Sequence, residues 1–278
     1  MHPRVGHINF LNCLPLTYSL LKCGYHKDMS LVMAVPSDLN KAMANEELDI
    51  SPMSSFAFAQ ISDKAMLMPN IGIVSDGEVQ SIILVSRKPI NELNQQKIIL
   101  TAQSATSHCL LKIILQKAYN LVPHYEIKKI DPRHLFEEND DYAAALLIGD
   151  DALYVNHNHQ AGLYYYDIGE QWKKMTGLPM VYAVWAVNRN FYREHKAEVA
   201  AIYKRLRGGF DNGIKNKSLM LDMVKEKTVF SRNQLMDYFE VIKYDVDEVR
   251  LNALQLFYKL AVECNLLEKM PSIEIVEI

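Results

Sequence analysis

This chain of 278 residues has few cysteines, no long apolar run and no excess of basic residues. The four cysteines are scattered and form no CxxC pair, which favours reduced thiols over a disulfide framework. No apolar run approaches the roughly 20 residues that a membrane-spanning helix needs. A formal net charge of −3 provides no basic surface for nucleic acid. The amino terminus lacks the basic and apolar regions of a secretory signal, so we expect a cytoplasmic protein that binds neither nucleic acid nor membrane.

Motifs for nucleotides and metals are also missing. No GxGxxG follows an expected strand and no GxxxxGK[ST] occurs, which excludes the usual dinucleotide and phosphate loops. His157 and His159 form a short histidine pair without a spaced third ligand, so a solvated loop explains them better than a metal site. The sequence therefore predicts neither a metal nor a cofactor.

Short apolar segments alternate with helical patterns, which is typical of βαβ units and predicts an α/β fold with mixed or mostly parallel sheets. We expect strands at residues 4–10, 30–35, 48–50, 71–75, 81–86, 97–100, 143–148, 164–167 and 181–187. We expect helices at residues 15–22, after a Ser37 cap, from Phe56, at 108–119, around 171–175, and at 194–206, 218–225, 232–239 and 246–264.

The α/β pattern restarts near Lys97 and gives way to helices after Asn188, which indicates two crossings between lobes. We expect a discontinuous lobe of residues 1–87 and 188–278, and a second lobe of residues 88–187. Clefts between lobes are common sites for small ligands. The amphipathic tail helices fit packing on their own lobe or on a second copy, so a monomer and a homodimer both remain open.

Hydroxyl side chains cluster where expected strands give way to helices. Ser54 and Ser55 follow one strand, while Ser104, Thr106 and Ser107 follow another. Helix N-termini present unpaired N–H groups and a partial positive charge, which together bind carboxylates or phosphates. One such cluster is usually only a helix cap, whereas two in different lobes indicate a ligand with two anionic groups.

Three further positions have both a structural and a functional interpretation. Asn12, between the first strand and first helix, fits an Asx cap before Pro15 or an amide that binds a ligand. Ser81 opens an apolar strand, where a lone serine is normally structural. Gly149 and Asp150 close a buried strand, and Asp150 fits a helix cap as well as a substrate contact.

Taken together, these segments resemble one family, chorismate dehydratase of the futalosine route to menaquinone. The matching stretches, in order, are Arg4–Leu16, Leu48–Ser55, Gly77–Ser86, Thr101–Ser107, Ala145–Leu153 and Gly169–Ala186. They cover both expected lobes, and the helical tail is similar only in character. His7 departs from a frequent arginine and Met180 from a common aromatic residue, and neither change removes a polar group assigned to the chemistry.

The resemblance implies a fold of the type II periplasmic-binding-protein kind and an enzyme that removes water from chorismate, giving 3-[(1-carboxyvinyl)oxy]benzoate. It implies that Asn12 and Ser81 are catalytic and hold the enolpyruvyl carboxylate of the substrate. The ring carboxylate would then bind either Ser104, Thr106 and Ser107 or the Ser54–Ser55 turn, with Gly149 and Asp150 nearby.

Two other functions remain open from the sequence. A small-anion solute-binding protein has the same fold, and the missing export signal argues against it. The related 1,4-dihydroxy-6-naphthoate synthase acts as a carbon–carbon lyase on a larger substrate. The segment from Asn12 to Leu16 and the segment from Trp172 to Trp185 fit the dehydratase better.

Overall fold

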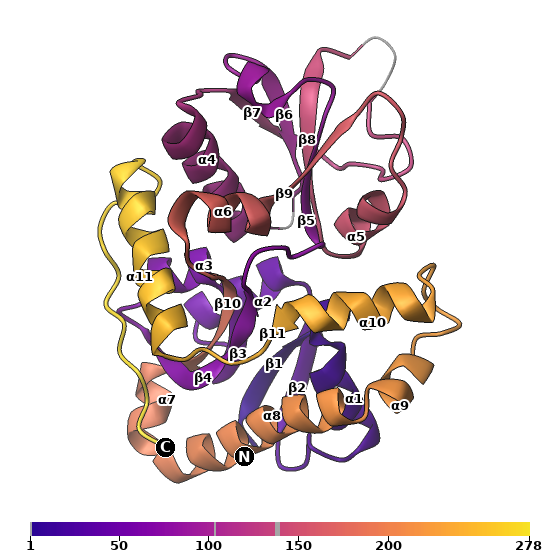
Figure 1. Cartoon of the computed structure of the whole chain (residues 1–278). Helices are drawn as coiled ribbons and strands as arrows, with labels where there is room; N and C mark the ends of the chain where they lie inside the picture. The colour runs from indigo at the N-terminus through magenta and orange to yellow at the C-terminus, as the bar shows by residue number, and fades with distance from the viewer. Residues whose placement is uncertain (1, 103, 137–139) are drawn as a thin grey trace. The chain divides into compact units, whose positions relative to one another are not determined.

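The computed structural model describes residues 2–102, 104–136 and 140–278, and the chain forms two compact units (Figure 1). The first unit comprises Met1–Val74, Val181–Glu248 and Pro271–Ile278. The second unit comprises Ser75–Met180 and Val249–Met270. Each unit is built around its own sheet with helices against it, as the alternating sequence pattern predicts.

The first unit is built on a six-stranded sheet with the order β11-β4-β10-β3-β1-β2. β1 pairs in parallel with β2 and β3, and β10 is antiparallel to β3, so the sheet is mixed. Its strands are β1 (Arg4–Ile8), β2 (Ser30–Ala34), β3 (Ile50–Ser54), β4 (Ala65–Ser75), β10 (Met180–Asn188) and β11 (Ile242–Lys243).

The longest helix of the first unit among the described residues, α8, packs against α1. Gly213 on α8 makes this approach close, because a Cβ atom there would lie 2.2 Å from the carbonyl oxygen of Pro15. The helices are η1 (Leu11–Cys13), α1 (Leu14–Lys22), α2 (Pro36–Ala44), α3 (Ser55–Gln60), α7 (Arg189–Glu194), α8 (Lys196–Lys215), α9 (Lys217–Asp222) and α10 (Arg232–Val241).

The second unit has a five-stranded sheet with the order β7-β6-β8-β5-β9. β6 is parallel to β7 and β8, whereas β5 is antiparallel to β8 and β9. The strands are β5 (Ile82–Ser86), β6 (Lys97–Leu100), β7 (His124–Ile127), β8 (Tyr142–Ile148) and β9 (Tyr164–Asp167). The helices are η2 (Ile90–Glu92), α4 (Ala105–Tyr119), α5 (Gly149–His157), α6 (Ile168–Thr176) and α11 (Glu248–Glu263).

The bounds of the units differ from the expected lobes, because most of α11 groups with the second unit rather than the first. The ring of Phe257 on α11 meets Trp172 edge-on at 6.2 Å, and Lys117 on α4 pairs with Glu263 at 2.6 Å. The chain therefore passes between the units four times, not twice, and the first unit ends at Val74 rather than at residue 87.

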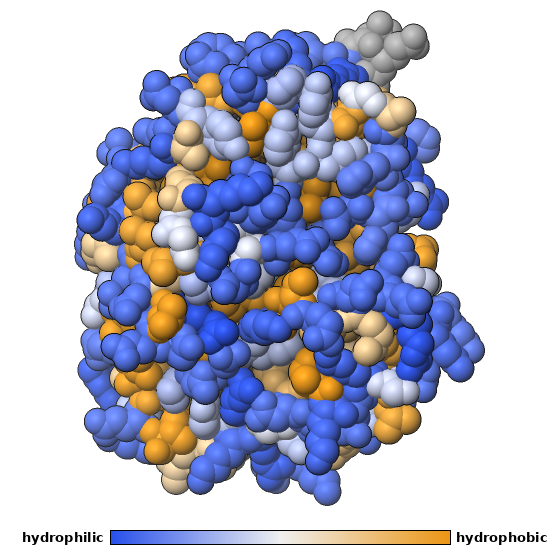
Figure 2. All heavy atoms as spheres, in the orientation of Figure 1, coloured by the Kyte–Doolittle hydropathy of each residue, from blue (hydrophilic) through white to orange (hydrophobic). Residues whose placement is uncertain are grey.

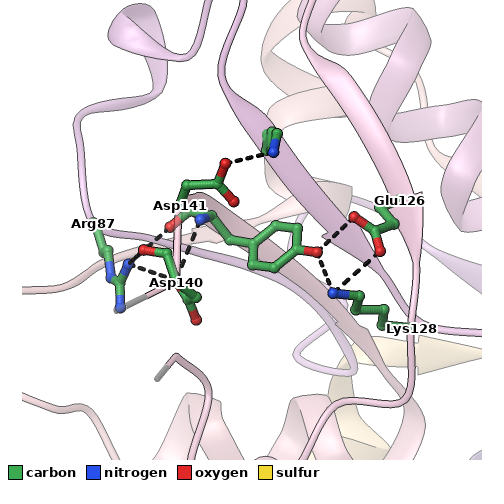
Figure 3. A network of polar contacts seen from close by, with 7 residues as sticks. Arg87, Glu126, Lys128, Asp140 and Asp141 are labelled. Carbon is green, nitrogen blue, oxygen red and sulfur yellow. Dashed lines mark hydrogen bonds and ion pairs between the residues drawn. The ribbon is translucent and has the colours of Figure 1, made fainter. Parts of the chain in front are cut away.

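Charged side chains gather where β8 begins, as Figure 3 shows. Arg87 donates to Asp140 at 2.7 Å, and Lys128 pairs with Glu126 at 3.1 Å. The Tyr142 hydroxyl joins the second pair by donating to Glu126 at 2.5 Å. This network lies at the opposite end of β8 from Gly149, so it is separate from the hydroxyl-rich positions described below.

Hydrophilic side chains predominate on the face drawn in Figure 2. Within the described ranges, no helix combines the length and apolar character needed to cross a membrane.

Candidate functional site

In the first unit, Asn12 lies on η1, directly after β1 and before α1. The N-cap residues of η1 and α1 are Phe10 and Cys13, and Oδ1 of Asn12 accepts no hydrogen bond from any described residue, so the Asx-cap interpretation is wrong. Its backbone carbonyl accepts a hydrogen bond from the Tyr244 hydroxyl at 2.9 Å. The Oδ1 atom is buried and has no hydrogen-bond partner among the described residues. A buried amide oxygen left in this way is costly, so the side chain is suited to pairing with a bound molecule.

A hydrogen-bond chain beneath Asn12 fixes the turn that carries it. Thr17 donates its hydroxyl hydrogen to the carbonyl of Cys13 at 3.0 Å, and Nε2 of His7 lies 2.7 Å from the same hydroxyl. Because threonine has one hydroxyl hydrogen, Nε2 of His7 must be the donor to Thr17. Burial lowers the pKa of His7 to about 4, so its ring is neutral at pH 7.

Ser54 ends β3 and Ser55 begins α3, whereas the sequence predicted a strand that stops at Ile50. Ser54 caps α3 by accepting from the Ala57 amide at 3.3 Å. Ser55 is buried and donates its hydroxyl to the Val181 carbonyl at 2.6 Å. These bonds are structural, and the Ser55 hydroxyl is committed to β10.

Asn12 and Ser54 lie at the same edge of the first unit's sheet. β1 and β3 are parallel neighbours, so their carboxyl ends meet there. Ligands of open α/β sheets bind outside this edge. The structure thus brings together the two positions of the first unit that the sequence analysis selected.

In the second unit, Ser104 caps α4, which begins at Ala105 and not at His108 as expected. The Ser104 hydroxyl oxygen accepts from the Ser107 amide at 3.2 Å and lies 2.8 Å from the Ser107 hydroxyl. Thr106 and Ser107 are buried in the first turn of the helix. The polar turn expected before it includes Gln103, which lies outside the described residues.

Gly149 and Asp150 open α5, a helix that the sequence analysis did not predict. Gly149 has a φ of +61°, a conformation that glycine adopts without strain. Its amide donates to the Ser81 carbonyl at 2.8 Å. Asp150 is exposed in the first turn, where its charge complements the helix dipole. The N-cap of α5 is Ile148, so Asp150 lies inside the helix and does not cap it, and its contact with substrate stays a prediction.

Ser81 precedes β5 and is buried, with its hydroxyl 3.3 Å from the Val79 carbonyl oxygen. β5 is antiparallel to β8, so the start of β5 meets the end of β8. β6 and β9 both run parallel to β8 in this sheet, and their ends lie at the same edge. The starts of α4, α5 and α6 therefore lie at the same sheet edge as Ser81, where helix N-termini carry partial positive charge.

Asp167 is a residue of this edge that the sequence analysis missed. It ends β9 and caps α6 by accepting from the Glu170 amide at 3.0 Å. The same carboxylate accepts from the amides of Val79 and Gln80, at 3.0 and 2.7 Å. Burial raises the pKa of Asp167 to about 6, against the lowering effect of the three N–H groups. The sequence does show an acidic residue at the end of an expected strand, which could have marked Asp167 as a candidate. Its hydrogen-bond partners are seen only in the folded structure.

The described residues contain no group of three or more histidine, cysteine or acidic side chains placed to hold a metal. The ring of His159 stacks on Tyr165 at 3.8 Å. The histidine pair at residues 157 and 159 thus remains without a metal assignment.

Solved structures with the same fold include several binding proteins. A protein of Archaeoglobus fulgidus matches with a TM-score of 0.76 and 19% identity, over 95% of this chain and 98% of its own. The alkanesulfonate-binding protein of Xanthomonas axonopodis, bound to MOPS, matches with a TM-score of 0.72 and 12% identity, over 99% and 98%. A Candida albicans protein with the generic periplasmic-binding-protein fold matches with a TM-score of 0.68 and 10% identity, over 97% of this chain and 92% of its own. The expected fold is confirmed.

Sequence comparison extends this likeness to a biosynthetic family. A chorismate dehydratase of Thermus thermophilus is 28% identical over 229 residues, covering 77% of this chain and 79% of that protein. A chorismate dehydratase of Campylobacter jejuni is 27% identical over 182 residues, covering 64% of each chain. The family model described as menaquinone biosynthesis matches residues 3–263. The chain therefore belongs to this menaquinone-biosynthesis family.

Proposed function

We propose that this protein is a chorismate dehydratase of menaquinone biosynthesis, a carbon–oxygen lyase that converts chorismate to 3-[(1-carboxyvinyl)oxy]benzoate. The observation that carries the proposal is the likeness to two chorismate dehydratases within a family match that spans residues 3–263. The helix N-termini at the sheet edge that carries Ser81 support it, because chorismate carries two carboxylates. The Asn12 side chain can donate to a carboxylate through Nδ2, while its buried Oδ1 can accept from a donor group of the bound molecule.

The reaction removes a hydrogen from ring carbon C3 and the hydroxyl from C4, and these leave together as one water. The C3–H electron pair becomes part of the ring, which is then aromatic. Aromaticity supplies the thermodynamic drive, so the protein's part is to orient the substrate and stabilise charge as the C–O bond breaks.

His7 in β1 and His108 in the first turns of α4 are poorly suited to act as the base. His7 is fully buried and bonded to Thr17, and burial lowers its pKa to about 4. Nε2 of His108 lies 2.6 Å from the Thr101 carbonyl oxygen, and burial lowers the pKa of this residue too. We therefore assign the base to the substrate itself: its enolpyruvyl carboxylate takes the C3 proton and passes it to the departing C4 hydroxide, which leaves as water. Asn12 and Ser81 hold that carboxylate.

The ring carboxylate has two candidate binding positions, and the hydrogen bonds favour the start of α4. α4 has 15 residues and presents Ser104, Thr106 and Ser107 at its N-terminus. α3 has only six residues, and the Ser55 hydroxyl is already bonded to Val181. The longer helix has the fuller dipole at its start, so we place the ring carboxylate at α4.

Replacing Asn12 tests the assignment of the side-chain carboxylate. Wild-type protein should convert chorismate, and Asn12→Ala should lower kcat by about 10²–10³-fold, the loss typical for removing one preorganised donor. Asn12→Asp should be at least as inactive, because it places a second negative charge against the substrate carboxylate. Initial rates of 3-[(1-carboxyvinyl)oxy]benzoate formation measure both effects.

Asn265→Asp is the matched control, because it makes the same change of charge at an exposed turn. This control should keep the wild-type rate, and all variants should unfold at similar temperatures. Normal turnover by Asn12→Asp at unchanged stability would refute the role of Asn12.

A further inference from the structure

The backbone before Ser81 forms a strained turn. The Ser81 amide donates to the Val79 carbonyl at 2.7 Å, and Gln80 between them has a φ of +61°. A hydrogen bond from residue i+2 to residue i with a positive φ at the centre defines a γ-turn, which is rare and strained for a residue other than glycine. Such a conformation persists only when its surroundings hold it.

The carboxylate of Asp167 supplies that hold. One of its oxygens accepts from the Gln80 amide at 2.7 Å and from the Val79 amide at 3.0 Å. The other oxygen accepts from the Glu170 amide at 3.0 Å and lies 3.1 Å from the Val79 amide nitrogen. Asp167 thus joins the start of α6 to a turn nearly ninety residues earlier in the chain.

Ser81 is restrained from the other side as well. Its carbonyl accepts from the Gly149 amide at 2.8 Å, at the start of α5. The position of Ser81 therefore depends on two attachments, the γ-turn held by Asp167 and the first residue of α5.

Helix capping alone does not account for this carboxylate. Ser104 and Ser231 cap α4 and α10, each accepting from an amide of its own helix through a single hydroxyl oxygen. A serine at residue 167 would meet the same need for α6. The second oxygen of Asp167 is used for the turn before Ser81.

We propose that Asp167 is a positioning residue, which fixes the γ-turn at Val79–Ser81 and so sets the orientation of Ser81 toward the substrate. This inference rests on the proposed dehydratase function, in which Ser81 holds the substrate carboxylate. Both oxygens of Asp167 already accept N–H groups, so its role is to hold the backbone and not to remove the proton.

Two substitutions separate this role from capping. Asp167→Asn keeps one acceptor oxygen, and Asp167→Ser keeps the cap of α6 but is too short to reach the turn. Asp140→Asn is the matched control, because it alters a similarly buried, hydrogen-bonded carboxylate of the same unit at the other end of β8. The readouts are steady-state kinetics with chorismate and the amide resonances of Val79, Gln80 and Glu170.

In both Asp167 variants the amide proton of Gln80 should move upfield, and in Asp167→Ser that of Glu170 should change least. The value of kcat/KM should fall by about 10²-fold, as for a reacting group misplaced by roughly 1 Å, with most of the loss in kcat. Asp140→Asn should change neither the Gln80 resonance nor the ratio of kcat to KM.

An unchanged Gln80 resonance in the Asp167 variants would overturn the inference, and so would a shifted resonance with the kinetics of the control. A wild-type protein inactive on chorismate would refute the proposed function instead. The amide resonances would then still decide whether Asp167 holds the turn.

Discussion

His7 shows how one buried side chain supports the turn that carries Asn12. Its ring is fully buried, and a positive charge there would lose its hydration without gaining a carboxylate partner. The Nε2–H donates to Thr17, and Thr17 donates to the Cys13 carbonyl next to Asn12. The neutral ring is therefore part of the local structure and not an acid–base catalyst.

We expect acid to weaken the first unit through His7. The folded pKa of about 4 lies below the ordinary 6.5, so the unfolded chain binds the proton more tightly. The contribution of neutral His7 to the free energy of unfolding is fully present above pH 6.5. It is lost as the pH falls toward 4, by about 3 kcal/mol in total. Ring ¹⁵N shifts should show a neutral Nε2–H form at pH 6, and titration of His7 near pH 6.5 would contradict this account.

Protonation of Asp167 stabilises the fold, whereas protonation of His7 destabilises it, so the titration of His7 must be followed at the residue itself. Its folded pKa of about 6 lies above the ordinary 3.8, with Glu78 adding a like charge to the dominant effect of burial. The destabilisation that its charge causes above pH 6 is relieved as the pH falls toward 3.8. Acid titration of the whole protein therefore sums two opposed contributions between about pH 4 and 6.

The sequence located the polar positions of the candidate site but not their bonds. Asn12, Ser104 and Gly149 each follow a strand and Ser81 precedes one, because hydroxyl, amide and glycine residues next to apolar runs mark the ends of strands. Ser55 looked equivalent and instead bonds to Val181, more than a hundred residues away. Asp167 was missed for the same reason, since its partners come from a distant part of the chain.

At the scale of elements, four strands were predicted almost to the residue. The bounds of β6 and β9 match the expected ranges, and β8 and β10 differ by single residues at their ends. Errors occurred where polar residues lie inside an element: β3 contains Ser51 and Pro52, and α5 begins with an acidic turn. Ser37 also lies inside α2, which is capped by Val35 without a side-chain bond. The polar residues after Ile50 indicated the end of the strand, but backbone pairing with β10 continues β3 to Ser54.

Packing of α1 against α8 gives a direct test at this scale. Gly213→Ala should destabilise the first unit by about 1–3 kcal/mol or more, because the new Cβ would overlap backbone atoms of Pro15. Gly208→Ala is the matched control on the same helix, where the nearest atom is Cε1 of Tyr25 at 3.5 Å. Its higher helix propensity should make that variant neutral or slightly stabilising. Urea unfolding measures both, and equal stability of the two variants would refute the close approach.

At the scale of the whole molecule, the fold class was predictable from the sequence, but the path of the chain between the units was not. A new α/β pattern in mid-sequence revealed a second unit with its own sheet. The C-terminal helices carried no sign of which unit they join, because an amphipathic pattern specifies a buried face and not its partner. Only the contacts of α11 with Trp172 and Lys117 show that it belongs with the second unit.

Product analysis tests most directly whether this protein dehydrates chorismate. Purified protein is incubated with chorismate without added metal or cofactor, and the mixture is resolved by chromatography and mass spectrometry. We expect chorismate to disappear as 3-[(1-carboxyvinyl)oxy]benzoate forms with the loss of one water. Unchanged chorismate in the presence of folded protein would contradict the account, and a chorismate-dependent rise in unfolding temperature without turnover would indicate a binding protein instead.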